Sequence, residues 1–279
     1  MDTKKIRKPA VAGRFYPSNK KELDTLIEEI YNKEKSQIEQ DSSSHDIIGG
    51  VVPHAGYIFS AYQAIHFFEH IRNYKEKFDT FIIINPNHTG FGEKISADSH
   101  SYWESPYGLV EQDAEFLEEL ELPFSDVAHS HEHSGEVMIP LLQYFVRYSF
   151  KIVVITLSQQ NPEQARYLAQ RIFDTSKKVN KKIAIIASSD FSHFKPAKTG
   201  FMMDEMVLEQ IKKQDINKLY NVVRENNISV CGYGPIMCLM EYSSMLGKYE
   251  TKILARGHSG QIIASDKVVD YISILFTKS

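Results

Sequence analysis

Short runs of almost unbroken apolar residues constrain the fold of this chain more than any other feature. Four of them read DIIGGVV (46–52), TFIIIN (80–85), KIVVITL (151–157) and KIAIIA (182–187), and two further runs follow at 261–264 and 268–276. A strand with one face in water alternates apolar and polar residues, whereas a strand covered on both faces does not. We therefore predict a mixed or largely parallel sheet with helices on both faces.

Amphipathic stretches lie between these runs and supply the predicted helices. They span 20–33, 60–72, 112–120, 136–148, 162–175, 201–213, 216–225 and 234–246. Strands that alternate with helices in this way predict an α/β layered fold. The chain has no internal repeat, and the polar stretch 35–45 is typical of a surface loop. We therefore predict one domain over residues 1–279.

Charge and hydropathy exclude several classes of partner. The chain has 32 Lys and Arg against 36 Asp and Glu, a net charge of −4, and no long basic run. Binding to nucleic-acid phosphates needs clustered basic residues, so no nucleic-acid partner is expected. No apolar run approaches the ~20 residues that cross a bilayer, and the N-terminal residues MDTKKIRKPA lack the apolar segment of a signal peptide. We predict a cytoplasmic protein without membrane contact.

Three histidines share one position relative to the predicted strands. His54 lies in VVPHAGY, His88 in INPNHTG and His193 in ASSDFSHF, each just after an apolar run. Ligands of open α/β sheets bind outside the carboxyl ends of the strands. Loops held by a sheet also carry much of protein chemistry. The three histidines are therefore predicted to converge on one site.

Converging imidazoles indicate a metal site, because neutral histidine is a common ligand of mid-to-late first-row metals. Two histidines with one anionic ligand leave positions open for a substrate or for oxygen. The sequence offers Asp190, Glu136 and the thiolate of Cys231 as the anion. Cys231 precedes a predicted helix, whose first amides are expected to lower the pKa of the thiol. Cys238 lies inside that helix among apolar residues and is predicted to fill the core.

A second histidine-rich stretch reads HSHEHSGE, from 129 to 136. We predict that His129 and His131 lie in an exposed loop. Ser134 has the chemistry to cap the helix predicted at 136–148. Glu136 would then lie in the first turn, where a carboxylate complements the helix dipole. These roles are structural and need no function.

Six short motifs occur in order along nearly the whole chain. They are VAGRFYP (11–17), PHAGY (53–57), NPNH (85–88), EHSGEV (132–137), SSDFSH (188–193) and CGYGPI (231–236). Together they resemble the Memo family, which is labelled AmmeMemoRadiSam system protein B in prokaryotes. That family is similar in fold to the LigB-type subunit of class III extradiol dioxygenases, which use non-haem Fe(II). The resemblance implies an α/β core with a metal pocket.

The resemblance also implies a role for individual residues. His54 and His88 match the two metal-binding histidines of the family, and Cys231 matches its metal-binding cysteine. Asp190 and His193 match the remaining pocket residues. The dioxygenases have a glutamate as the third ligand, so a cysteine there departs from the enzyme pattern. This chain also has Gly135 where the family often has Ile, and Gly234 before the last motif's proline, and neither position is a proposed ligand.

The first functional hypothesis is a mononuclear metal-dependent redox enzyme with Fe(II) or Cu(I) held by His54, His88 and Cys231. His193 would be the catalytic acid or base, and Asp190 would orient it or bind substrate. Tyr57 would hydrogen-bond a substrate. A thiolate is a soft donor that favours Cu(I) or zinc more than a carboxylate does, which weakens the case for catechol cleavage.

Two other hypotheses stay open at this point. The protein would bind a metal or a peptide without turnover, as a partner in a modification or signalling pathway. The prokaryotic family label suggests AMMECR-type and radical-SAM proteins as such partners. Alternatively, Cys231 and His193 would form the nucleophile and base of a cysteine hydrolase.

Overall fold

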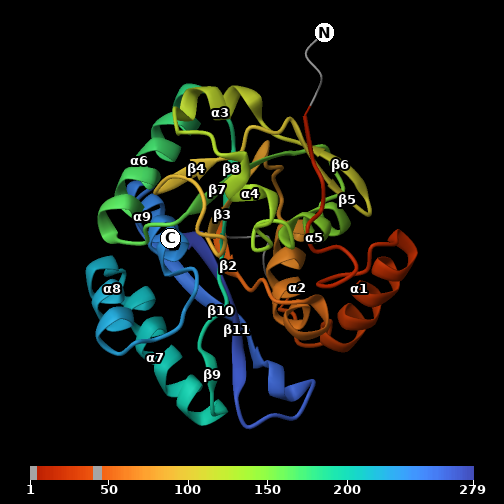
Figure 1. Cartoon of the computed structure of the whole chain (residues 1–279). Helices are drawn as coiled ribbons and strands as arrows, with labels where there is room; N and C mark the ends of the chain where they lie inside the picture. Colours follow the sequence, from red (N-terminus) through yellow and green to blue (C-terminus); the bar gives the residue numbers. More distant parts are fainter. Residues whose placement is uncertain (1–4, 40–45) are drawn as a thin grey trace.

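The computed structural model describes residues 5–39 and 46–279, and its centre is an eight-stranded sheet (Figure 1). The strand order is β10-β11-β2-β8-β3-β7-β4, with β9 paired to β11. The strands are β2 (Asp46–Val52), β3 (Thr80–Pro86), β4 (Ile95–Ala97), β7 (Lys151–Leu157), β8 (Ile183–Ser188), β9 (His193–Lys195), β10 (Tyr249–His258) and β11 (Val268–Lys278). The central strands β2, β8, β3 and β7 are parallel, whereas β4, β10 and β11 pair antiparallel. The predicted mixed sheet is confirmed.

Helices cover both faces of this sheet. They are α1 (Lys20–Glu34), α2 (Tyr57–Asn73), α3 (Ala114–Leu120), α4 (Asp126–Ser130), α5 (Met138–Phe145), α6 (Pro162–Lys178), α7 (Ala197–Lys213), α8 (Ile216–Glu225) and α9 (Tyr233–Met245). Ile82 and Ile84 of β3 pack in one core with α3 and α6 to α9, while Phe81 and Ile83 pack in the other with α1, α2 and α5. Successive side chains of a strand point to opposite faces, so an unbroken apolar run serves both cores.

A small second sheet lies beside the large one and ties the N-terminal segment to the body. Its order is β1-β5-β6, formed by β1 (Ile6–Arg7), β5 (Tyr102–Ser105) and β6 (Gly108–Glu111). The short alternating pattern of these strands gave no prediction from sequence. Among the described residues, no helix is both long and apolar enough to cross a membrane.

Several predicted elements differ from the structure. The strand predicted at 261–264 is wrong, because β10 ends at His258 and a 3₁₀ turn follows at Ser259–Gln261. β10 was missed because it is an outer strand with many exposed positions and polar residues. The helix predicted at 136–148 begins only at Met138. The loop predicted at 35–45 begins as a turn, and its residues 40–45 lie outside the described residues.

Candidate metal site

The site lies where three neighbouring parallel strands end. β8 lies between β2 and β3 in the sheet, so the carboxyl ends of these strands meet at one edge. His54 follows β2, His88 follows β3, and Ser188 is the last residue of β8. This is the place where an open α/β sheet binds its ligands.

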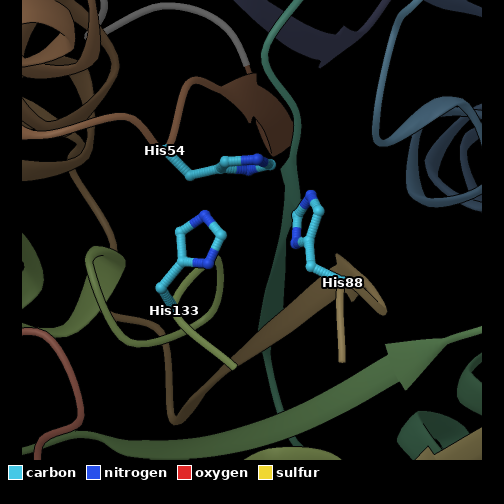
Figure 2. A group of neighbouring side chains, drawn as sticks. All are labelled: His54, His88 and His133. Carbon is cyan, nitrogen blue, oxygen red and sulfur yellow. The ribbon is translucent and has the colours of Figure 1, made fainter. Parts of the chain in front are cut away.

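Three imidazole rings face one another at this edge: His54, His88 and His133 (Figure 2). Their ring centroids are 5.3 Å apart for His54 and His88, 5.5 Å for His54 and His133, and 4.7 Å for His88 and His133. One ligand atom from each lies within 4.8 Å of the others. The structure thus brings two predicted histidines together and adds a third.

The ring of His54 is fixed through its Nδ1 atom. Nδ1 lies 2.7 Å from the Ser188 hydroxyl, and that hydroxyl donates its own hydrogen to the Ser134 carbonyl at 2.7 Å. The hydroxyl must therefore accept from Nδ1–H, which leaves the lone pair of the neutral ring on Nε2. Burial, followed by repulsion from His88 and His133, lowers the pKa of His54, so the ring is neutral.

His88 is fixed in the same way by a carboxylate. Its Nδ1 lies 2.9 Å from Oε1 of Glu132, and its backbone amide donates to Oε2 at 2.6 Å. Burial alone would raise the pKa of Glu132, but hydrogen bonds from His88 and Ser134 outweigh it and lower the pKa to about 2. Because the carboxylate accepts from Nδ1–H, the second nitrogen of the ring is left for the pocket. Many metal-binding histidines donate their other N–H to a carboxylate in this way.

His133 is the residue of the pocket that the sequence did not assign. Its Nδ1 lies 3.5 Å from Oε1 of Glu132, and its ring packs 4.9 Å from Phe15. Burial lowers the pKa of His133 to about 4, so the ring is neutral and has a lone pair for a ligand. Its signal in the sequence is its place in EHSGEV, one of the six motifs of the family resemblance, in which a role at a helix start is predicted only for Ser134 and Glu136.

Cys231 adjoins the three imidazoles through His54. Its Sγ lies 3.1 Å from His54 Nε2 and accepts from the Asp190 amide at 3.2 Å. Gln160 holds the loop, since its Nε2 donates to the Cys231 carbonyl at 2.8 Å and its Oε1 accepts from the Gly234 amide at 2.7 Å. Cys238 is fully buried in the core.

The expected lowering of the Cys231 pKa by the following helix is wrong. Burial raises the pKa of the thiol, and the charge of Asp190 adds to the effect. Helix α9 begins only at Tyr233, and the thiol is shielded from water before it. A high thiol pKa disfavours a free nucleophile. The thiol also contacts His54, whereas the hydrolase hypothesis paired it with His193.

Asp190 lies on the loop after β8, and His193 is the first residue of β9, which follows that loop. Oδ1 of Asp190 accepts from the His54 amide at 2.7 Å, and burial raises the pKa of Asp190 to about 6. Nδ1 of His193 lies 2.6 Å from the Phe191 carbonyl and 2.8 Å from the Ser229 carbonyl. Carbonyls only accept, so Nδ1 carries a hydrogen and Nε2 is left for another partner.

Tyr57 and Glu136 have partners away from the three imidazoles. Tyr57 is buried, and its hydroxyl donates to the Val137 carbonyl at 2.7 Å, so its predicted contact with substrate has no support in this geometry. Glu136 is ion-paired with Arg7, which removes it as the anionic ligand considered from sequence. Ser134 does not cap α5, because its hydroxyl donates to Glu132 at 2.6 Å.

The exposed loop predicted for His129 is also wrong. His129 is fully buried at the end of α4, and its Nε2 lies 3.1 Å from the Ser96 carbonyl. Two residues further on, His131 is exposed as predicted. The histidine-rich stretch 129–136 alternates histidine with other polar residues, and this pattern does not predict the short helix α4.

Two buried aspartates, Asp204 and Asp270, hold Ser192, the residue that precedes His193. Oδ1 of Asp204 accepts from the amide and hydroxyl of Ser192 at 3.0 and 2.6 Å, and the Asp270 amide donates to the Ser192 carbonyl at 2.9 Å. Burial and then repulsion from Asp270 raise the pKa of Asp204 to about 7, and burial raises that of Asp270 to about 6.

The raised pKa values of Asp204 and Asp270 lead us to expect that these two groups contribute less to the free energy of unfolding as the pH rises. Between the ordinary value of 3.8 and the raised values, the folded state binds more protons than the unfolded chain, so stability is lost from about pH 4 to 7. Asp270→Asn should make urea denaturation less dependent on pH between pH 5 and 7.5. Asp174→Asn, at an exposed aspartate, should leave the dependence unchanged. Equal pH dependence in wild type and Asp270→Asn would contradict the prediction.

The fold and the pocket define an α/β protein with a histidine-rich candidate metal site at its strand ends. The sequence profile of the Memo-like protein family matches residues 7–275. A MEMO1 family protein of Methanobrevibacter smithii is 39% identical, with 97% of this chain and 99% of the relative covered. One of Methanococcoides burtonii is 35% identical with the same coverage. This chain therefore belongs to the Memo family.

A solved structure supports the fold at greater distance. The uncharacterized protein JW3007 from Escherichia coli K12 superposes with a TM-score of 0.53 at 12% sequence identity. The match covers 81% of this chain and 99% of that one. At this identity the likeness concerns the fold alone.

Proposed function

We propose that this protein binds one transition-metal ion, iron or copper, and uses it in a redox reaction. The observation that carries the proposal is the way in which the rings of His54 and His88 are held. In both rings Nδ1 is bonded to a fixed partner, Ser188 for His54 and Glu132 for His88. In both rings Nε2 is therefore the nitrogen whose lone pair is able to bind a metal. Such second partners are typical of metal-binding histidines, because they set the tautomer and the ring orientation.

One pair of the donor atoms has a spacing that suits a shared ion. Ligands that share a metal at about 2.0–2.3 Å lie roughly 3–4 Å from each other. His54 Nε2 and Cys231 Sγ are 3.1 Å apart, which is in this range. The ligand atoms of the three histidines lie within 4.8 Å of one another, and Cys231 contacts this group through His54. In this proposal His54, His88 and Cys231 would hold the ion, and His133 is a candidate for a further position. Imidazole with thiolate suits Cu(I) and Fe(II) better than it suits hard cations such as magnesium.

A bound iron or copper ion would supply electron transfer and Lewis acidity. The residues of the chain would supply the protons. The Cys231 thiol would lose its proton on binding the ion, so metal uptake releases protons. Asp190, with a pKa of about 6, is able to take up or give a proton near neutral pH. His193 Nε2 is the second group proposed for this role.

A second candidate function is metal or peptide binding without turnover. It is favoured by the hydroxyl of Tyr57, which was expected to contact a substrate but donates to Val137 instead. In this case the protein would serve as a partner of AMMECR-type and radical-SAM proteins in a modification pathway, or as a partner in signalling. The redox enzyme and the metal-binding form of the second candidate both need the metal, so turnover separates them, whereas peptide binding alone does not need it.

Anaerobic reconstitution with Fe(II) or with Cu(I), followed by elemental analysis, tests the metal site. We expect one ion per chain, lost in His54→Ala and in His88→Ala, and held about 10- to 100-fold more weakly in Glu132→Gln. His131→Ala, at an exposed histidine of the neighbouring loop, is the matched control and should bind normally. Wild-type protein that binds neither ion would rule out the redox enzyme and the metal-binding form of the second candidate, and would leave peptide binding alone.

Oxygen uptake by the reconstituted protein then tests catalysis. Catechols and small thiols are the first substrates to measure. Turnover that is lost in His193→Gln while the metal content stays at one per chain would support the redox enzyme. A fully loaded protein that consumes no oxygen with any of these compounds would favour the binding protein.

A further inference from the structure

A cavity away from the candidate metal site is lined by a histidine, a carboxylate and apolar side chains. It has a volume of about 510 Å³ and lies where β5 and β6 meet the start of α3. None of the candidate metal-site residues lines it. Its size falls within the range of small-molecule sites, about 300–1,000 Å³. The lining includes His100, Glu118, Leu117 and Phe124.

His100 is held toward this cavity by a buried carboxylate. Its Nδ1 lies 2.7 Å from Oδ1 of Asp98, whose side chain is fully buried. Oδ2 of Asp98 accepts from Trp103 Nε1 at 2.7 Å and from Gln112 Nε2 at 3.0 Å. Burial alone would raise the pKa of Asp98, but the hydrogen bond from His100 and the other partners lower it, so Asp98 is a carboxylate.

Since the carboxylate only accepts, Nδ1 of His100 carries a hydrogen. In the form of the ring that has its one hydrogen on Nδ1, Nε2 is an acceptor on a side chain that lines the cavity. Gln112 fixes the loop further, because its Nε2 also donates to the His100 carbonyl at 2.7 Å. A ring that is oriented from behind and presents one acceptor is a prepared hydrogen-bonding group.

The same cluster is a poor metal site although Asp98, His100 and Asp126 have ligand atoms within 4.8 Å of one another. Both oxygens of Asp98 have the partners described above. Oδ1 of Asp126 accepts from the Ser99 hydroxyl at 2.6 Å, and Oδ2 is ion-paired with Lys5. The ammonium of Lys5 already balances this carboxylate, so a metal would have to break several hydrogen bonds and one ion pair.

The remaining lining determines which ligand suits the cavity. Glu118 is exposed on α3, and Glu111 lines the cavity while pairing with Lys151 at 2.9 Å. His100 is the one basic side chain among the lining residues. Carboxylates there repel anions and attract cations. Leu117 and Phe124 offer apolar surface, and an aromatic face also attracts a cation.

We propose that this cavity binds a small organic amine, with its ammonium group hydrogen-bonded to His100 Nε2 and its apolar or aromatic body against Leu117 and Phe124. Glu118 supplies the charge that favours a cation over a neutral analogue. The site is independent of the proposed metal function, so each can fail without the other.

NMR of the full-length, ¹⁵N-histidine-labelled protein tests this, with the His100 ring signals assigned by their loss in His100→Gln. The probes are phenethylamine, 2-phenylethanol and phenylacetate, three molecules of similar shape and different charge. Phenethylamine should shift the His100 signals saturably, 2-phenylethanol should bind more weakly, and phenylacetate should not bind. Phenylacetate that binds as tightly as the amine would overturn the proposal, and so would the absence of any shift.

Variants locate the binding. Ala114→Trp, at an exposed position of the lining, should block the cavity without touching the Asp98–His100 pair and should abolish the shifts. Glu118→Gln should weaken the amine about three- to fivefold and leave the alcohol unchanged, the size expected of an exposed charge pair. Glu119→Gln, the same change on the same helix outside the lining, should have no effect. Amine binding that survives Ala114→Trp, or Zn²⁺ binding at His100 without amine binding, would overturn the proposal.

Discussion

Glu136→Gln should lower the free energy of unfolding by about 3–5 kcal/mol, the cost of breaking a buried ion pair. Glu136 is 1% exposed and paired with Arg7, which is also 1% exposed at its side chain. Its carboxylate further accepts from the amides of Ala10 and Val11 at 2.8 and 3.0 Å and from the Tyr16 hydroxyl at 2.7 Å. The side-chain amide of glutamine has an NH₂ group, which would face these N–H and O–H donors without an acceptor. The charge of Arg7 would also lose its counter-ion.

Urea denaturation of Glu136→Gln, Arg7→Met and the double variant measures this effect. The double variant should be less destabilised than the sum of the two single ones, with a coupling of about 0.5–3 kcal/mol. Glu104→Gln is the matched control, because Glu104 pairs with Lys8 at 2.7 Å near the surface and should cost under about 1 kcal/mol. A loss below about 1 kcal/mol in Glu136→Gln would show that the pair contributes no more than a surface pair.

Gly232→Ala should displace the loop of Cys231. A Cβ atom at Gly232 would lie 2.2 Å from the Ser188 carbonyl oxygen and 2.6 Å from the Ser189 Cβ. Backbone has no room to yield here, since Ser188 ends β8 and its hydroxyl holds His54. We expect a destabilisation of about 1–3 kcal/mol and a separation of Cys231 from His54.

Thiol labelling of the folded protein detects this displacement. In wild type Cys231 is largely shielded and Cys238 fully buried, so both should react slowly with a disulfide reagent. Gly232→Ala should expose one thiol to fast labelling. Gly56→Ala is the matched control beside His54, because its Cβ would meet the nearest atom at an ordinary 3.5 Å. Slow labelling and normal stability in Gly232→Ala would contradict the expected displacement.

The sequence predicted the central elements of the fold because their pattern follows directly from burial. The runs at 46–52 and 151–157 match β2 and β7 in both bounds, and 216–225 matches α8. β10 and the small sheet were not predictable in this way. Their strands are short or half-exposed, so their pairing depends on residues far away in the chain rather than on local periodicity.

The candidate site likewise has residues whose positions follow from the sequence pattern and residues whose positions depend on tertiary contacts. The positions of His54 and His88 followed from the rule that ligands bind at strand ends. The place of His133 did not, because its ring lies against Phe15 and Glu132, and the contact with Phe15 joins segments far apart in the chain. The high pKa of the Cys231 thiol was equally hidden, since burial is a property of the folded chain. The ligand roles of these residues stay predictions until a metal is measured.

The position of β8 has a consequence for the order in which this protein acquires its pocket during synthesis. β8 pairs with β2 on one side and with β3 on the other, and it is the strand that sets the spacing between the loops of His54 and His88. A ribosome releases residues 46–86 long before residues 183–188. A nascent chain therefore carries His54, His88 and His133 while the strand that aligns the first two is still untranslated. The pocket can form only after translation has passed Ser188, and Cys231 joins it later still.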